Sequence, residues 1–336
     1  MTTIETTYRQ AVRQAIHDEM AADRSVVLLG EDVGAAGGVF KATEELFGTF
    51  GGDRVRDTPI SEQAIVGLAM GAAIRGMRPV VDLMFADFVA VAMDQLAIEI
   101  PKYRYMTGGQ ATLPLVVRAA AGAGLGFGSQ HSGCPEAWFM HVPGWRVVTP
   151  ATPQDAYSLL RAAIRSDDPV LVFEHKALYA RRGTVDTELR LEIGKANALR
   201  DGEDLTIVAN LMMVERALAA ADQLAAAGIS AAVVDLRGVA PLDVATVAAS
   251  VRRTGRLLTV EESPGPAGWG AELLARIAEE ELDSLDQVRR LSGPPTPIPY
   301  APNLEAAWIP STDAVVRIGR EMVQGTVASV PGGGQS

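Results

Sequence analysis

The sequence has a single cysteine, Cys134, among its 336 residues, so the chain cannot form a disulfide with itself. So few cysteines are typical of proteins in a reducing compartment, and we expect a cytoplasmic location. No apolar run reaches the length of a membrane-spanning helix without a charge, a glycine or a proline interrupting it. The first twenty residues also lack the apolar core of a secretory signal. These absences argue against a membrane protein and against a disulfide-stabilised secreted domain.

Positive charge is scarce. The sequence has 30 lysines and arginines against 41 acidic residues, which gives a net charge of −11. The basic residues form no block or stripe along the chain. An acidic surface of this kind disfavours binding to nucleic acid and to anionic membranes, so we expect neither as a partner.

Common ligand-binding motifs are also missing. The sequence contains no phosphate-binding P-loop pattern. Glycines follow the apolar run LPLVVRAA, but the third glycine of a dinucleotide-binding motif is replaced by Phe127, Ser129 or His131, depending on where the count starts. We therefore expect no nicotinamide site there, and the glycines predict a mobile or closely approached loop. Four histidines and one cysteine give no zinc signature.

What the sequence does contain is an alternation of helix and strand patterns. Short apolar runs predict buried parallel strands, and segments with apolar residues at helical spacing separate them. This alternation predicts an α/β fold with a parallel sheet. The predicted strands include SVVLLG, RPVVDLMF and LPLVVRAA, and the predicted helices include residues 7–23, 41–51, 61–76 and 89–106.

A change in composition divides the chain. We predict one α/β domain over residues 1–185 and a smaller α/β domain over residues 205–328. Residues 186–204 are polar and lack a strong helical period, so they are the predicted linker. Residues 329–336 form a glycine-rich end, which we expect to be disordered.

An acidic residue at the start of the small-residue helix allows two interpretations. In the first, Ser61 caps the helix and Glu62 complements the helix dipole, an effect of about 0.3–1 kcal/mol. In the second, Glu62 is a catalytic group on a rigid element. Gly67 and Gly71 lie one turn apart, so another backbone can approach this helix closely. Burial against it would raise the pKa of the carboxyl, while the helix start would lower it.

Other polar residues near the predicted strand ends are also open to two interpretations. His131 follows the glycine-rich segment and is suited to carrying protons near neutral pH. Cys134 lies nearby but lacks the helper residue that an activated nucleophile needs, so we expect it to be inert. Asp82 and Asp87 fit an acid–base pair, but solvated charges at a strand end are the favoured interpretation.

The long segment LLGEDVGAAGGVFKATEELFGTFGGDRVRDTPISEQAIVGLAMGAAIRGMRPVVDLMFADF resembles the β subunit of the E1 component of 2-oxo acid dehydrogenase complexes, a group that includes pyruvate, branched-chain and acetoin dehydrogenases. The resemblance continues through KYRYMTGGQ, SQHSG, PGWRVVTP and PIPYAPNLE, and it covers roughly residues 5 to 325. It implies an α/β fold in which a parallel-sheet pyrimidine-binding domain precedes a smaller transketolase C-terminal-like domain.

The resemblance also implies cofactors and partners. The family uses thiamine diphosphate, with Mg²⁺ held mainly by an α subunit, in an α2β2 heterotetramer. A lipoyl-bearing E2 acyltransferase then accepts the acyl group.

Site residues follow from the same resemblance. Glu62 matches the glutamate that hydrogen-bonds the aminopyrimidine ring and so promotes loss of the thiazolium C2 proton. Phe88 matches the aromatic residue that packs on that ring, and His131 matches the active-site histidine. Backbone carbonyls around Ala163 and Ile164 match a structural K⁺ site of some members.

Several positions depart from the family pattern. Gly133 stands where a glutamine is usual, Asp82 stands where glutamate is common, and the loop SPGPAGWGAEL differs in a region used for assembly. The expected function is oxidative decarboxylation of a 2-oxo acid, or cleavage of acetoin, with acyl transfer to a lipoyl domain. One alternative is the small subunit of a split transketolase-like enzyme, with Arg181 and Arg182 as candidate phosphate ligands. Another is a non-catalytic supporting subunit.

Overall fold

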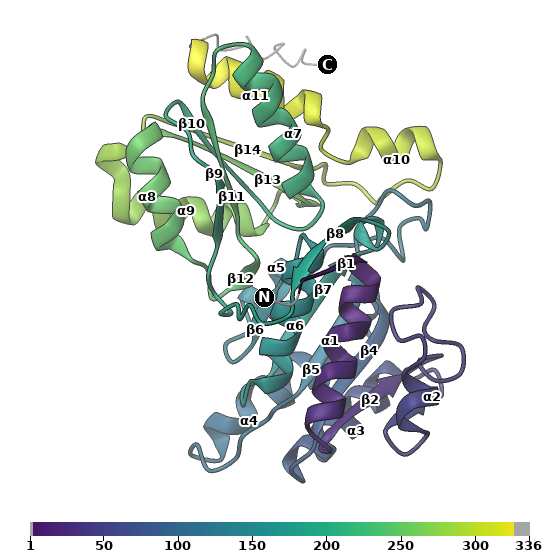
Figure 1. The fold of residues 1–336 in the computed structure, drawn as a ribbon. Helices are drawn as coiled ribbons and strands as arrows, with labels where there is room; N and C mark the ends of the chain where they lie inside the picture. Colours follow the sequence, from purple (N-terminus) through teal and green to yellow (C-terminus); the bar gives the residue numbers. More distant parts are fainter. Residues whose placement is uncertain (1–2, 326–336) are drawn as a thin grey trace, which may run out of the picture.

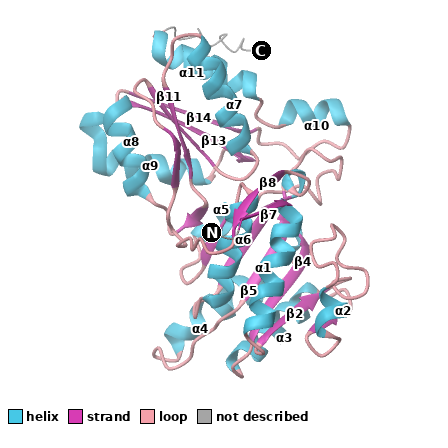
Figure 2. Ribbon diagram, viewed as in Figure 1, coloured by secondary structure: helices cyan, strands magenta, loops and turns pink. Residues whose placement is uncertain are grey.

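The computed structural model describes residues 3–325, so the disordered end predicted over residues 329–336 lies outside the described part. Two α/β units follow each other along the chain and stack end to end (Figure 1). In each unit the strands lie in the middle and the helices outside (Figure 2). None of the helices in residues 3–325 is long and apolar enough to cross a membrane.

The first unit is built on a seven-stranded sheet in the order β12-β6-β7-β5-β4-β2-β3. Every neighbouring pair is parallel except β12 and β6. The predicted parallel α/β fold is therefore confirmed. The strands are β2 (Val26–Gly30), β3 (Val55–Asp57), β4 (Arg78–Phe85), β5 (Val116–Ala121), β6 (Arg146–Val148), β7 (Val170–His175) and β12 (Gly238–Ala240).

Helices cover both faces of this sheet because each presents an apolar side. On one face, α1 (Tyr8–Ala22) packs on α6 (Pro153–Arg165), and their buried residues share one core cluster with β2. On the other face, the core includes residues of α3 (Glu62–Ile74), α4 (Ile100–Met106) and α5 (Glu136–Met140). A two-stranded antiparallel ribbon of β1 (Thr3–Thr7) and β8 (Arg182–Asp186) lies beside α1.

Two helices predicted in this unit are broken. Within residues 41–51 only α2 (Leu46–Phe50) forms, because Lys41 and Glu45 adopt left-handed backbone conformations with φ of 60° and 68°. Residues 89–106 contain the end of a 3₁₀ turn (Ala86–Ala90), a π-helical turn (Asp94–Glu99) and then α4. Pro101 has no N–H to donate to an α-helical bond, which accounts for the irregular turn before it.

The second unit is a five-stranded sheet in the order β14-β13-β10-β11-β9. Its core lies between this sheet and two helices, α7 (Met213–Ala226) and α11 (Thr312–Gln324). Two more helices, α8 (Val244–Thr254) and α9 (Trp269–Glu281), pack on the opposite face (Figure 1). The strands are β9 (Asn197–Arg200), β10 (Leu205–Ala209), β11 (Ala231–Asp235), β13 (Arg256–Pro264) and β14 (Gln287–Gly293).

The boundary between the units is not a single linker segment. β9 lies inside residues 186–204 and pairs antiparallel with β11, so part of that segment belongs to the second sheet. β12 follows β11 in the chain but completes the first sheet. Both strands are short and at sheet edges, so neither has the apolar run that predicts a buried strand. The short helix α10 (Pro302–Trp308) reaches from the second unit towards the end of the first (Figure 1).

Candidate active site

The predicted site residues follow the carboxyl ends of parallel strands, where ligands bind in open α/β sheets. Glu62 follows β3 after a four-residue connection, and Phe88 follows β4. His131 lies on the loop after β5. Because these ends meet at one edge of the sheet, the topology gathers the three residues there.

Glu62 is the first residue of α3, and its side chain is only 7% exposed. Ser61 is the N-cap residue, but its side chain makes no capping hydrogen bond. Within residues 3–325, no group donates a hydrogen bond to the Glu62 carboxylate or forms a salt bridge with it. Most of the residue is covered, but its carboxylate makes no bond within the described chain and is free to meet a ligand or a partner chain. The Ser61 cap of the helix-start interpretation is absent, whereas Glu62 still lies in the first turn of α3, where a carboxylate complements the helix dipole.

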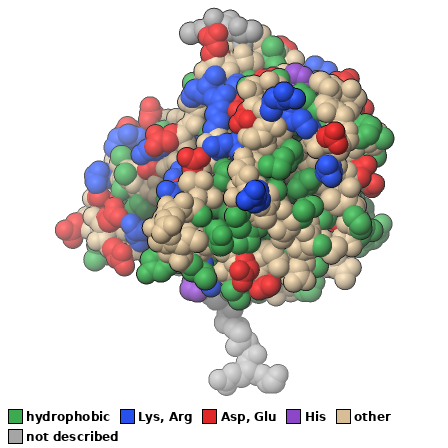
Figure 3. Space-filling view, turned by 90° about the horizontal axis from the view of Figure 1, so that it is seen from below, with side chains coloured by type: hydrophobic (Ala, Val, Ile, Leu, Met, Phe, Trp, Pro, Cys, Tyr) green, Lys and Arg blue, Asp and Glu red, His purple; other side chains and the backbone are tan. Residues whose placement is uncertain are grey.

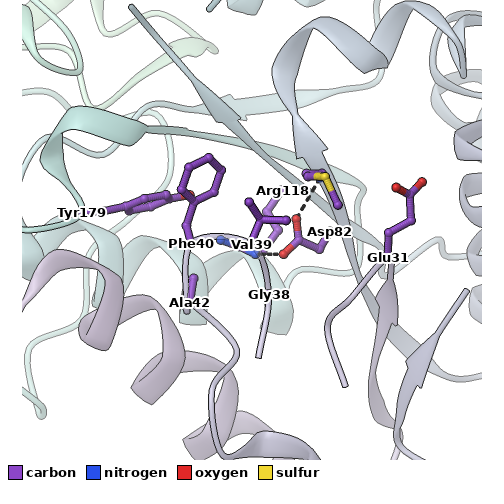
Figure 4. Close-up of a pocket in the computed structure, with 9 residues that line it drawn as sticks. Glu31, Gly38, Val39, Phe40, Ala42, Asp82, Arg118 and Tyr179 are labelled. Atoms are coloured by element: carbon purple, nitrogen blue, oxygen red, sulfur yellow. Dashed lines mark hydrogen bonds and ion pairs between the residues drawn. The ribbon is translucent and has the colours of Figure 1, made fainter. Parts of the chain in front are cut away.

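Glu31 is an acid near Glu62 that no motif in the sequence marks. It follows β2 directly, and burial followed by the negative charge of Glu62 raises its pKa above the usual value for a glutamate. Figure 4 shows Glu31 at the edge of a small cavity, beside Asp82. An acid at the carboxyl end of a buried parallel strand is the signal that points to it.

His131 lies against two aromatic rings. Its imidazole meets the Phe85 ring edge-on, with centroids 4.6 Å apart, and the Phe88 ring at 5.3 Å. The two phenylalanine rings contact each other at 5.7 Å. The structure therefore brings Phe88 and His131 together and adds Phe85, which the sequence analysis treated only as the end of a strand. Glu62 makes no hydrogen bond or ring contact with either residue in the described part of the chain.

Asp82 fits neither interpretation offered for it from the sequence. It forms an ion pair with Arg118, whose side chain is buried (Figure 4). Arg118 also makes two hydrogen bonds to Glu174, at 2.8 and 2.6 Å. The other Asp82 oxygen accepts the N–H of Met84 at 3.0 Å, and Met84 has a positive φ of 48°. This buried network holds the strained end of β4, where Phe85 lies and which the turn carrying Phe88 follows.

Cys134 is buried, and burial raises the pKa of its thiol well above the usual value. A thiol in this state is a weak nucleophile, as expected for an inert cysteine.

The carbonyls suggested for K⁺ are already hydrogen-bonded. The Ile164 carbonyl accepts a bond from an Arg78 nitrogen at 3.1 Å, and the same nitrogen reaches the Ser166 carbonyl at 3.0 Å. The Ala163 carbonyl accepts the N–H of Ser166. The carbonyls of Ala163 and Ile164 thus each already accept one hydrogen bond, and the K⁺ site stays a prediction.

Comparison with known proteins agrees with this architecture. Residues 5–182 match the family model described as the transketolase pyrimidine-binding domain, and residues 194–315 match the transketolase C-terminal domain. A chain of a split-gene transketolase, solved as an inactive β4 tetramer, has a similar fold, with a TM-score of 0.77 and 24% identity over 94% of this chain and 98% of its own.

Two relatives are more similar in sequence. The β-2 subunit of the mitochondrial pyruvate dehydrogenase E1 component from Oryza sativa subsp. japonica is 45% identical over 93% of this chain and 85% of its own length. The β subunit of acetoin:2,6-dichlorophenolindophenol oxidoreductase from Cupriavidus necator is 44% identical over 94% of this chain and 96% of its own length.

The fold and the site together define a two-domain chain of the transketolase type. More specifically, the chain belongs to the family of E1 β subunits of 2-oxo acid and acetoin dehydrogenases.

Proposed function

We propose that this chain is the β subunit of a thiamine-diphosphate-dependent E1 enzyme that acts on a 2-oxo acid or on acetoin. The observation that carries the proposal is Glu62, a residue only 7% exposed at the start of α3, whose carboxylate has no hydrogen-bond partner among residues 3–325. Phe88 and His131 lie together at the same edge of the sheet. When bound, thiamine diphosphate supplies a thiazolium carbon that adds to the substrate carbonyl.

The residues of this chain fit the pyrimidine half of that cofactor. Glu62 holds or releases a proton at its carboxylate oxygen towards a ring nitrogen, which is general acid–base chemistry on a rigid element. The Phe88 ring offers an apolar surface for a flat heterocycle. His131 presents an imidazole, whose ring nitrogens can donate or accept hydrogen bonds, beside the Phe85 and Phe88 rings.

The proposal requires a second chain. The α3 helix leaves part of its surface uncovered by this chain: no atom lies within 4 Å of a Cβ placed at Gly71, and Leu68 is 57% exposed. Hydrophobic side chains gather on the end of the molecule where α3 and α4 lie (Figures 1 and 3). Uncovered apolar surface of this kind marks interfaces.

The proposed assembly is an α2β2 heterotetramer in which the α subunit holds Mg²⁺ and the diphosphate. Within residues 3–325, no three His, Cys, Asp or Glu side chains are arranged as a metal site. A lipoyl-bearing E2 acyltransferase is the proposed acceptor of the acyl group. The proposed location is the cytoplasm, in keeping with one buried and unpaired cysteine.

The structure gives less support to the transketolase-like alternative. Of its two candidate phosphate ligands, Arg181 is already paired with Glu215 of the second unit at 2.9 Å, while Arg182 has no ion pair among residues 3–325. The alternative of a non-catalytic subunit leaves the buried Glu62 without a function.

The proposal is tested with the chain reconstituted with its α partner, thiamine diphosphate and Mg²⁺. A panel of 2-oxo acids and acetoin is assayed with an artificial electron acceptor, which needs no lipoyl protein. We expect turnover with at least one of them. Glu62→Gln lowers that turnover by at least about tenfold, because the amide cannot exchange the proton. Unchanged turnover in the assembled variant contradicts the role of Glu62, and activity only with sugar phosphates supports the alternative.

A further inference from the structure

The glycine-rich loop that leads to His131 is held by the second unit. This loop, residues 122–130, starts at the end of β5 and includes Gly122, Gly124, Gly126 and Gly128, which have positive φ values between 72° and 101°. Such backbone conformations are open to glycine at no steric cost. The sequence predicted either a mobile loop or a close approach by another group. The structure shows the close approach.

Glu305 is the first contact. It lies on α10 and is 4% exposed. Its carboxylate accepts the N–H of Gly124 at 2.8 Å through one oxygen and the N–H of Gly126 at 3.0 Å through the other. A single side chain of the second unit thus fixes two turns of the loop with charge-assisted hydrogen bonds.

Glu262 is the second contact. It lies near the end of β13 and is 3% exposed. One oxygen accepts the N–H of Ala123 at 2.5 Å, and the other accepts from Nε2 of His175 at 2.8 Å. Nδ1 of His175 accepts the N–H of Ala177, which leaves Nε2 to carry the proton. Burial alone would raise the pKa of Glu262, but His175 and the Ala123 amide outweigh burial and lower it.

The contacts continue to the neighbourhood of His131. The Ser129 hydroxyl donates to the carbonyl of Ile298 in the second unit at 2.7 Å. The Phe127 ring contacts the Phe85 ring at 5.6 Å, and Phe85 in turn contacts His131. The loop therefore leads directly into His131 and packs, through Phe127, on one of the rings that contact the histidine.

The charges at this contact are balanced only in part. Lys176 is 3% exposed, and its ammonium group has no hydrogen-bond partner among the described residues. It lies 5.7 Å from the centre of the Phe85 ring and 5.9 Å from that of Phe127. Its positive charge is attracted by Glu262, Asp87 and Glu305. Burying the carboxylates of Glu262 and Glu305 costs free energy unless their hydrogen bonds are kept. Loss of their bonds to the loop is therefore strongly disfavoured.

We propose that Glu305 and Glu262 are positioning residues of the active site, through which the second unit holds the loop of residues 122–130 and thereby sets the position of His131. The inference rests on the proposed function for the role of His131. It gives the second unit, which supplies none of the predicted site residues, a direct influence on catalysis.

The experiment compares Glu305→Ala and Glu305→Gln in the reconstituted complex, with Glu272→Gln as the control. Glu272 is an exposed acid on α9, in the same unit. Glu305→Ala is expected to lower kcat at least about tenfold with little change in cofactor binding. Glu305→Gln retains one acceptor oxygen, so its kcat should lie between those of Glu305→Ala and wild type. Hydrogen exchange of residues 122–130 should rise at least about tenfold in Glu305→Ala and stay unchanged in the control.

A double-mutant cycle separates positioning from general destabilisation. If Glu305 acts through His131, adding Glu305→Ala to His131→Ala causes little further loss of kcat. The inference would be overturned if the losses of kcat in the two single variants add up in the double variant. It would also be overturned if Glu305→Ala has the same kcat as the Glu272→Gln control, or if its hydrogen exchange is faster throughout the chain. A wild-type complex that is inactive on the whole substrate panel refutes the proposed function instead. In that case loop exchange in Glu305→Ala equal to wild type overturns the inference separately.

Discussion

At the scale of single residues, the candidate site gathers side chains from several strand ends at one edge of the first sheet. Glu62, Phe88 and His131 were selected from the sequence because motifs mark them. Glu31 and Phe85 were missed because their importance comes from contacts between strands that are distant in the sequence. Asp82 was assigned to solvent, but its partner Arg118 lies 36 residues away in the chain. Local patterns carry no information on such pairings.

Glu136 provides a prediction at the same scale. It is the first residue of α5, is 1% exposed, and accepts a hydrogen bond from Asn210 of the second unit at 3.2 Å. Burial raises its pKa to about 7. The unfolded chain loses this proton near pH 4.3, so the folded state binds more protons between these pH values. The contribution of Glu136 to stability therefore falls as pH rises from about 4.5 to 7.

Glu136→Gln removes this dependence because the amide does not titrate. The free energy of unfolding of the variant, relative to wild type, should rise by about 1–3 kcal/mol between pH 5 and pH 8. Urea denaturation of both proteins at the two pH values measures this difference, in which the other titrating groups cancel. A difference that is the same at pH 5 and pH 8 would show that Glu136 is not protonated in the folded state.

At the scale of elements, regular patterns predicted regular structure. The long apolar runs became β2, β4 and β5, and the small-residue segment became α3 within two residues of its predicted ends. The segment 89–106 kept a helical period but broke into separate turns before Pro101. β12 was missed because a three-residue edge strand has too few residues to show a period.

The open surface of α3 leads to a prediction for Gly71. A Cβ placed there has no atom within 4 Å to meet, so Gly71→Leu should leave the melting temperature of the isolated chain unchanged or slightly higher. In the proposed assembly the added side chain obstructs the partner, and co-purification with the α subunit should fall at least about tenfold. Gly48→Leu is the matched control, since Gly48 lies in α2 and also has no neighbouring atoms. Assembly as strong as in the control would exclude this surface from the interface.

At the scale of the whole molecule, the two units depend on each other. β12 joins the first sheet, while Glu305 and Glu262 hold a loop of the first unit. The sequence predicted two domains and their order but not this exchange of contacts, because each contact is a single residue or a short strand. In the proposed function, the resulting edge of the first sheet is the pyrimidine-binding half-site, and the α subunit supplies the other half.

The isolated chain provides a prediction at this scale. Without an α subunit it should show no measurable turnover and only weak binding of thiamine diphosphate, since in the proposed assembly the groups for the diphosphate lie on the partner. Isothermal titration calorimetry and the electron-acceptor assay measure the two quantities. Addition of the α subunit should restore both, whereas full activity of the purified single chain would contradict a shared site.

The central claim is that the Glu62 carboxylate acts on the cofactor, and the exchange of the C2 proton of bound thiamine diphosphate for deuterium measures this directly, without any substrate. In the reconstituted complex at neutral pH, we predict that Glu62→Gln slows this exchange at least about tenfold relative to wild type, while the α subunit and the cofactor remain bound. Equal exchange rates in the two assembled enzymes would contradict the claim.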